Sequence, residues 1–147
     1  MIRQDPLHRP CSLAAGTSGT AAVEFALLLP LYLFLLLGMT AYGIYFGAAH
    51  SVQQLSADAA RTAIAGLDAQ ERQRLAHSFI ERNADGYLFI QLDKLTIAVG
   101  DSEADASQFD VTLSYDARKL PIWGLWERLP MPDETILRRA TIRMGGI

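Results

Sequence analysis

The chain has 147 residues, a formal net charge of −3 and a single cysteine, and half of its residues are hydrophobic. This length is enough for one domain and an anchor, the charge supplies no basic patch for nucleic acid, and one cysteine excludes an intrachain disulfide. No charged side chain occurs from Phe25 to Ala49, so we interpret the chain as an anchor followed by a folded domain.

The apolar run from about Ala21 to Tyr45 predicts one membrane-spanning helix. About 25 helical residues measure roughly 37 Å, against a hydrocarbon core of about 30 Å. Arg3 and Arg9 precede the run and the flank after it is neutral, which places the N-terminus in the cytoplasm. A cleaved secretory signal is the alternative, although its apolar core is usually shorter. Pro30 predicts a kink that is either harmless or lets the helix adapt when subunits pack.

Glu24 stands at the start of this run, where an unpaired carboxylate drawn into lipid would be costly. One interpretation is that it marks the membrane edge and stays in water, where it interacts favourably with the helix dipole. The other follows from spacing, because Gly19 lies five residues earlier and Phe25 follows directly. Small, flexible residues before a helix suit a protease that must seat an extended backbone.

The pattern Gly-x-x-x-x-Glu-Phe before an apolar helix resembles the class III prepilin site, which a membrane aspartic peptidase cuts after the glycine. Residues 21–30, AAVEFALLLP, closely resemble the opening of TadE-like proteins, the pseudopilins or minor pilins of the tight-adherence (Flp) pilus system. The resemblance implies cleavage between Gly19 and Thr20. It also implies that the Glu24 carboxylate pairs with the new amine of a neighbouring subunit, which offsets the cost of a charge in a low-dielectric site.

The resemblance suggests three segments: a cleaved cytoplasmic leader at 1–19, a transmembrane helix at 20–46 and an extracytoplasmic domain at 47–147. We expect a single-pass protein of the bacterial inner membrane with a periplasmic C-terminal domain, which enters the extracellular fibre or acts only in its assembly. The implied partners are the prepilin peptidase, a TadF-like pseudopilin, the major Flp pilin, and the pilus assembly platform with its ATPase. The alternative function is an uncleaved, single-pass membrane-anchored sensor or binding domain.

Helical periodicity continues beyond the anchor. Apolar residues at helical spacing over 52–63 predict that the first helix extends to about Ala65, with Gly66 as its stop. Their small side chains fit either a core face against the protein's own sheet or a groove for a partner. A capping box at 68–71 predicts a second helix over 69–83.

The period then changes to two. Segments 95–99, 109–115 and 139–144 alternate apolar and polar side chains, which predicts half-buried strands. An acidic turn over 100–107 joins the first two as an antiparallel hairpin, and one polar face per strand fits a sheet covered on one side. The expected fold is α+β: a long N-terminal transmembrane helix that continues outside, a second helix, and a small three-stranded antiparallel sheet, a plan that pilins share.

The apolar segment LPIWGLW, residues 120–126, separates the second and third strands. Trp123 and Trp126 either fill the gap between sheet and helices or form a contact surface for a partner or the outer membrane leaflet.

The sequence shows no catalytic constellation. Its three histidines, at positions 8, 50 and 77, have no metal-binding spacing with one another or with Cys11, and no glycine-rich phosphate loop precedes a helix. Alternating carboxylates over 101–105 suggest calcium, but the other ligands of an EF-hand are missing. We therefore expect no enzyme activity, cofactor or metal, and a membrane-tethered enzyme is disfavoured for want of a site.

Overall fold

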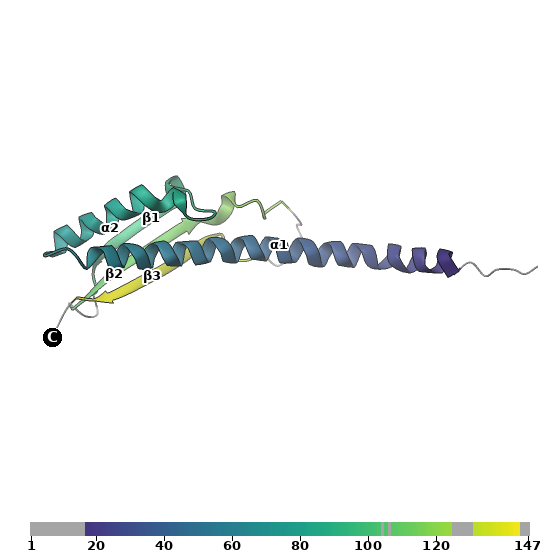
Figure 1. Ribbon diagram of the computed structural model, residues 1–147, viewed down its shortest axis with the longest axis horizontal. Coiled ribbons are helices and arrows are strands. Elements are labelled where there is room, and N and C mark those ends of the chain that lie inside the picture. Colours follow the sequence, from purple (N-terminus) through teal and green to yellow (C-terminus); the bar gives the residue numbers. More distant parts are fainter. Residues whose placement is uncertain (1–16, 104, 106, 125–130, 145–147) are drawn as a thin grey trace, which may run out of the picture. The chain divides into compact units, whose positions relative to one another are not determined.

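The computed structural model describes residues 17–103, 105, 107–124 and 131–144. These belong to two compact units, one ending at Leu36 and the other beginning at Leu37. One long helix contributes to both units, and the remaining elements belong to the second (Figure 1). In chain order the described elements are α1 (Thr17–Ala63), α2 (Ala69–Asn83), η1 (Ala84–Gly86), η2 (Leu92–Lys94), β1 (Leu95–Asp101), β2 (Gln108–Asp116), η3 (Ala117–Lys119) and β3 (Thr135–Arg143).

The predicted α+β fold is confirmed. The sheet has the strand order β1-β2-β3, and both strand pairs are antiparallel. Gly100 of β1 lies opposite Asp110 of β2, and Tyr115 of β2 lies opposite Ile136 of β3. The central strand β2 alternates apolar and polar residues along its whole length, because one of its faces lies on the core and the other does not.

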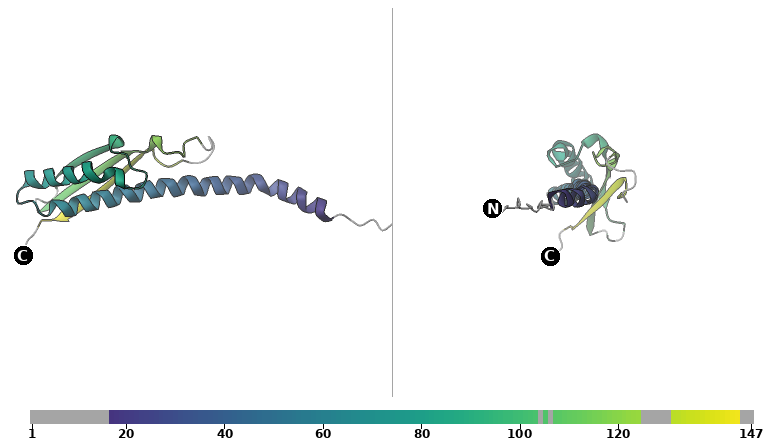
Figure 2. Two further views of the ribbon diagram at one scale, coloured as in Figure 1. Left: turned by 45° about the horizontal axis from the view of Figure 1, so that its top comes forward. Right: turned by 90° about the vertical axis from the view of Figure 1, so that its right-hand side faces the viewer.

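The core of the second unit lies between its helices and one face of the sheet. Alternate residues of β2 point into this core and are buried, namely Phe109, Val111, Leu113 and Tyr115. The end-on view shows α1 and α2 on the same side of the sheet (Figure 2). No described helix covers the other face, which carries the polar residues of each strand.

The part of α1 in the second unit buries a stripe of small and aliphatic side chains. Ala48, Val52, Leu55, Ala59 and Ala63 are all fully buried. They recur every three or four residues, so they lie along one side of the helix. All five belong to the protein's own hydrophobic core. Of the two interpretations of this stripe, the structure therefore supports a core face rather than an open groove.

Gly66, in the turn after α1, is needed for steric reasons, which the periodicity of the sequence does not show. No described glycine has a positive φ, so Gly66 is not a left-handed cap. A β-carbon on Gly66 would lie 2.7 Å from the backbone nitrogen of Arg72. The glycine therefore lets the start of α2 approach the end of α1 closely.

The second helix has the predicted bounds and a capping box displaced by one residue. The Asp68 carboxylate accepts a hydrogen bond of 2.7 Å from the backbone N–H of Glu71. The Glu71 carboxylate reaches back to the N–H of Leu67, at 2.8 Å, rather than to the N–H of the cap residue itself.

Strand β3 begins at Thr135, four residues before the predicted start at Arg139. Two adjacent apolar residues and two adjacent arginines, ILRR over 136–139, hide its alternation in the sequence. In the structure Ile136 is buried while Leu137 is exposed. Pairing with β2 fixes the register, and it holds Leu137 on the uncovered face despite its apolar side chain.

Candidate functional site

The N-terminal part of α1 is a helix long and apolar enough to cross a membrane. Its large apolar side chains are exposed, as at Val23, Leu27 and Leu31. None of its most apolar stretch is buried against the rest of the protein. One such N-terminal helix fits a single-pass membrane protein, because lipid then replaces water around these side chains.

Glu24 is exposed on this helix. It is the one charged residue between Thr17 and Ala49. Gly19 and Thr20 precede it on the same helix and are also exposed. The structure therefore places the proposed cleavage residues and the carboxylate together at the N-terminal end of α1.

The described part of α1 starts at Thr17, so the Gly19–Thr20 bond is helical in the structure. The alanines at 21 and 22 are strong helix formers, and helix propagates easily from such residues. A glycine costs about 1 kcal/mol in a helix relative to alanine. Apart from its own helix backbone and its chain neighbours, no described atom lies within 4 Å of the β-carbon position of Gly19. The Gly19–Thr20 bond therefore lies on an exposed stretch of α1 that contains a weak helix former.

Apolar side chains line a shallow furrow of about 220 Å³ along α1 in the first unit, namely Phe25, Leu28, Leu29, Tyr32, Leu33 and Leu36. Steps of three and four residues keep them on one side of the helix. Pro30 lies about 140° around the helix from Phe25, at about 100° per residue. Because proline has no N–H, the carbonyl of Ala26 lacks its usual helical donor, which makes this the predicted point of bending.

Trp123 is half-buried against the core of the second unit. Its indole Nε1–H donates a hydrogen bond of 2.6 Å to the carbonyl of Ala117. Trp126 lies outside the described residues. The structure ties the Trp123 ring to its own domain and leaves part of it exposed, so a partner contact at these tryptophans stays a prediction.

Asp110 is buried although it lies on the sheet face that no described helix covers. The Arg139 guanidinium donates to one of its carboxylate oxygens, and the Thr141 hydroxyl donates to the other at 2.5 Å. The hydrogen bond from Arg139 holds the pKa of the Asp110 carboxyl at about 2. The Asp110 carboxylate therefore links β2 to β3, and both of its oxygens already accept hydrogen bonds.

The carboxylates of the β1–β2 turn also have protein partners. Asp105 accepts from the backbone N–H and the hydroxyl of Ser107, at 2.8 and 2.6 Å. Asp101 lies 3.4 Å from the guanidinium of Arg72. Within the described residues, no group of three His, Cys, Asp or Glu side chains could hold a metal ion.

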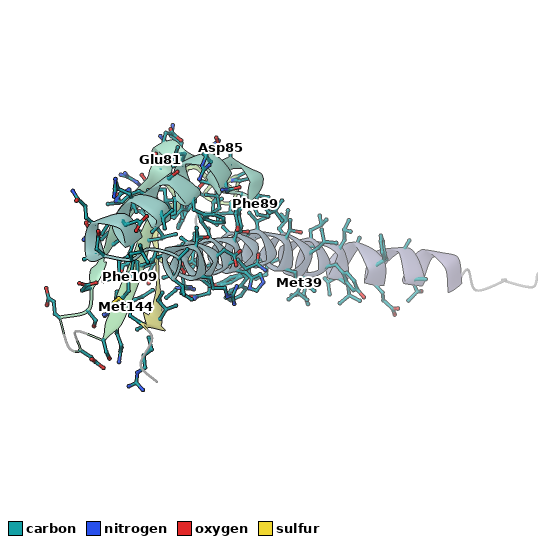
Figure 3. The ribbon with its side chains drawn as sticks, turned by 60° about the vertical axis from the view of Figure 1, so that its left-hand side comes forward. Met39, Glu81, Asp85, Phe89, Phe109 and Met144 are labelled. Atoms are coloured by element: carbon teal, nitrogen blue, oxygen red, sulfur yellow. The ribbon has the colours of Figure 1, made fainter. Side chains whose placement is uncertain are left out.

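The connection from α2 to β1 carries two exposed apolar residues that the sequence did not single out. Leu88 is 64% exposed, and Phe89 is 37% exposed and has a φ of 64°. No other described non-glycine residue has a positive φ. A β-carbon on Gly47 would lie 3.2 Å from the Phe89 ring, which lies beside α1 (Figure 3). The one available signal was the run YLFI over 87–90, which follows Gly86 and fits no periodic pattern.

Residues 19–61 match the family model described as TadE-like protein. This is a structural family associated with the Tad pilus. The matched segment contains all the predicted processing residues together with Pro30 and most of the buried stripe of α1. Neither the curated proteins nor the solved structures contain a match to the chain.

Proposed function

Since residues 19–61 match the TadE-like family model, we propose that this chain is a pseudopilin or minor pilin of a tight-adherence, type IV-like pilus. A prepilin peptidase cuts it between Gly19 and Thr20, and the shortened chain then takes part in pilus assembly. The observation that carries the proposal is the position of Gly19 and Glu24 at the start of an exposed apolar helix that matches this family.

Cleavage changes the place of Glu24 in its helix. After a cut between Gly19 and Thr20, Glu24 is the fifth residue of the shortened chain. It then adjoins the turn whose N–H groups lack helical acceptors, and it lies close to a new positive amine. The cut therefore gives the carboxylate a positive counterpart, in its own chain or in a neighbouring subunit, which lowers the cost of placing it at the membrane.

The furrow between Phe25 and Leu36 supports packing against another helix in the membrane. Lipid tails are as apolar as leucine, so helices associate there through close van der Waals contact. The furrow offers a shaped apolar surface beginning directly after Glu24. A TadF-like pseudopilin or the major Flp pilin, held at the assembly platform and its ATPase, is the partner class we propose.

The charges flanking the helix support a cytoplasmic N-terminus. Arg3 and Arg9 precede the apolar run, and no basic residue of the Lys/Arg type follows it until Arg61. Positive residues remain on the cytoplasmic side of membrane helices. The domain from residue 47 onward then lies in the periplasm, and the protein sits in the bacterial inner membrane before any entry into a fibre.

Mass spectrometry of the mature N-terminus tests the processing step. The chain is co-expressed with a prepilin peptidase of a tight-adherence system or with a peptidase whose catalytic aspartates are replaced. We expect Thr20 as the first residue only with the active peptidase, loss of cutting in Gly19→Leu, and normal cutting in the matched control Gly16→Leu. An uncut chain that retains Met1 would instead favour a membrane-anchored sensor or binding domain.

Immunolabelling of sheared pili tests the assembly role. In wild-type cells with the peptidase, a fibre component would be labelled along the fibres or at their tips. If the chain acts only in assembly, its deletion should remove the fibres. Cells without the peptidase supply the control. Normal fibres in the deletion strain, together with unlabelled fibres in the wild type, would remove the assembly role even if the chain is cut.

A further inference from the structure

Several connections of the second unit leave the sheet at the same end. The antiparallel register pairs Leu95, the first residue of β1, with Tyr115 near the end of β2. It also pairs Asp116, the last residue of β2, with Thr135, the first residue of β3. The α2–β1 connection and the segment that follows β2 are therefore neighbours in space.

This end of the sheet lies beside α1 at the point where the proposed span of residues 20–46 ends. The Phe89 ring contacts α1 at Gly47, the next residue. Met39, within the span, is 77% exposed. Figure 3 shows Phe89 on the side toward Met39 and Phe109 toward the opposite end of the sheet. All four residues belong to the second unit.

The loop that carries Leu88 is held on both sides. The Tyr87 hydroxyl donates a hydrogen bond of 2.8 Å to the carboxylate of Asp58 on α1. The Tyr115 hydroxyl donates one of 2.8 Å to the carbonyl of Phe89. A loop fixed at these two points cannot easily turn Leu88 inward, so its exposure is a property of the fold.

A hollow of about 220 Å³ connects Phe89 to the segment after β2, where Lys119 and Pro121 line it. Both of these residues are exposed. Lys119 forms no ion pair with another residue in the described part of the chain, whereas Arg118 is paired with Asp116 at 2.7 Å. The surface therefore combines exposed apolar groups with an ammonium on a long apolar stem, which suits the boundary between acyl chains and phosphate headgroups.

We propose that Leu88, Phe89 and Pro121 form a second membrane contact, inserted into the periplasmic leaflet with Lys119 at the headgroups. The inference rests on the proposed membrane insertion of residues 20–46. The occupant is the bilayer rather than a protein because this surface adjoins the residue at which the helix leaves the lipid. A single helix leaves a domain free to tilt, and a second contact restricts that tilt, so assembling subunits are presented in one orientation.

Site-directed spin labelling of the full chain in nanodiscs of phosphatidylcholine and phosphatidylglycerol tests the contact. Cys11→Ser removes the native thiol, and a nitroxide is attached in turn at Leu88→Cys, Met39→Cys and Leu67→Cys. Leu67 is the matched control because it is a 92% exposed leucine four residues beyond Ala63, where α1 ends. The helix from Gly47 to Ala63 alone rises about 24 Å. Collision rates with oxygen, which concentrates in lipid, and with a water-soluble nickel chelate are measured at each position.

We expect Leu88 to follow Met39, with high oxygen and low nickel accessibility, and Leu67 to show the reverse. A label at Pro121→Cys, on the other loop, should also be less accessible to nickel than Leu67. Nickel accessibility at Leu88 equal to that at Leu67 overturns the proposal. Low accessibility to both reagents also overturns it, because a second copy or another protein then covers the loop. Nickel accessibility at Met39 would instead show that the span itself is not in the membrane.

Discussion

The hydroxyl of Tyr115, on the central strand, donates a hydrogen bond of 2.8 Å to the backbone carbonyl of Phe89, the described non-glycine residue with a positive φ. Tyr115 is almost completely buried, so the bond ties the α2–β1 connection to the sheet from within the core. We expect Tyr115→Phe to lower the free energy of unfolding by about 1 kcal/mol, since a hydrogen-bonded carbonyl loses its donor.

Hydrogen exchange of the full chain in detergent measures this effect. The amides of residues 87–90 should exchange faster in Tyr115→Phe, and by a larger factor than those of α2, which respond only to the change in global stability. Tyr32→Phe, at an exposed tyrosine of the apolar helix, is the control, and it should leave the exchange rates of residues 87–90 and of α2 unchanged. Unaltered exchange in the loop would show that the bond does not hold it.

Phe89 combines a left-handed backbone with a ring that packs on Gly47. Phe89→Ala loses the ring and keeps the strained conformation, whereas Phe89→Gly loses the ring and relieves the strain. Because a β-carbon in this conformation costs about 1–2 kcal/mol, and glycine adds some unfolded-state entropy, we expect the glycine variant to be the more stable of the two by up to about 1 kcal/mol. Thermal unfolding followed by circular dichroism compares them, and an alanine variant that is as stable would contradict the strain.

Gly66 permits the close approach of α2 to the end of α1. Gly66→Ala should destabilise the domain by about 1–3 kcal/mol, because the methyl group would overlap the backbone of Arg72 and force a shift. Gly86→Ala is the matched control, since no atom lies within 4 Å of its β-carbon position, and it should be neutral or slightly stabilising. Equal melting temperatures for the two variants would refute the steric role of Gly66.

Asp110 makes stability dependent on acid pH. Its pKa in the folded protein is about 2, below the ordinary value of 3.8, because Arg139 donates a hydrogen bond to the carboxylate. A lowered pKa gives stability that is present above pH 3.8 and is lost as the pH falls toward 2. We expect this contribution to be about 1–2 kcal/mol, after allowance for the partial exposure of Arg139.

Asp110→Asn should remove this acid-sensitive contribution to the free energy of unfolding. The variant should be less stable than the wild type at pH 6 but nearly as stable at pH 2. Arg139→Gln should reduce the same pH dependence by removing the donor. Unfolding of each protein followed from pH 6 to pH 2 provides the measurement, and an unchanged slope in Asp110→Asn would assign the acid sensitivity to other groups.

Helices and strands could be predicted from the sequence where a local pattern, such as alternation or a capping box, determines which side chains are buried. Period-two alternation located β1 and β2, and the polar pair at 68–71 located the start of α2. The prediction was wrong at the start of β3, because Leu137 breaks the alternation and only pairing with β2 fixes its face. The predicted first helix is present, and it continues without a break through the apolar run to Ala63.

The sequence by itself determined the apolar helix and the spacing of Gly19, Glu24 and Pro30 along it, because charge, size and periodicity are local properties of the chain. Only the tertiary structure decided that Phe89 lies on Gly47 and beside Pro121. These residues are distant in sequence. The packing of α1 in the second unit brings Gly47 to Phe89, and the register of β1 with β2 brings the loop of Phe89 to Pro121. A periodic pattern tells which side of a helix or strand is apolar, but it carries no information on which loops meet at the end of a sheet.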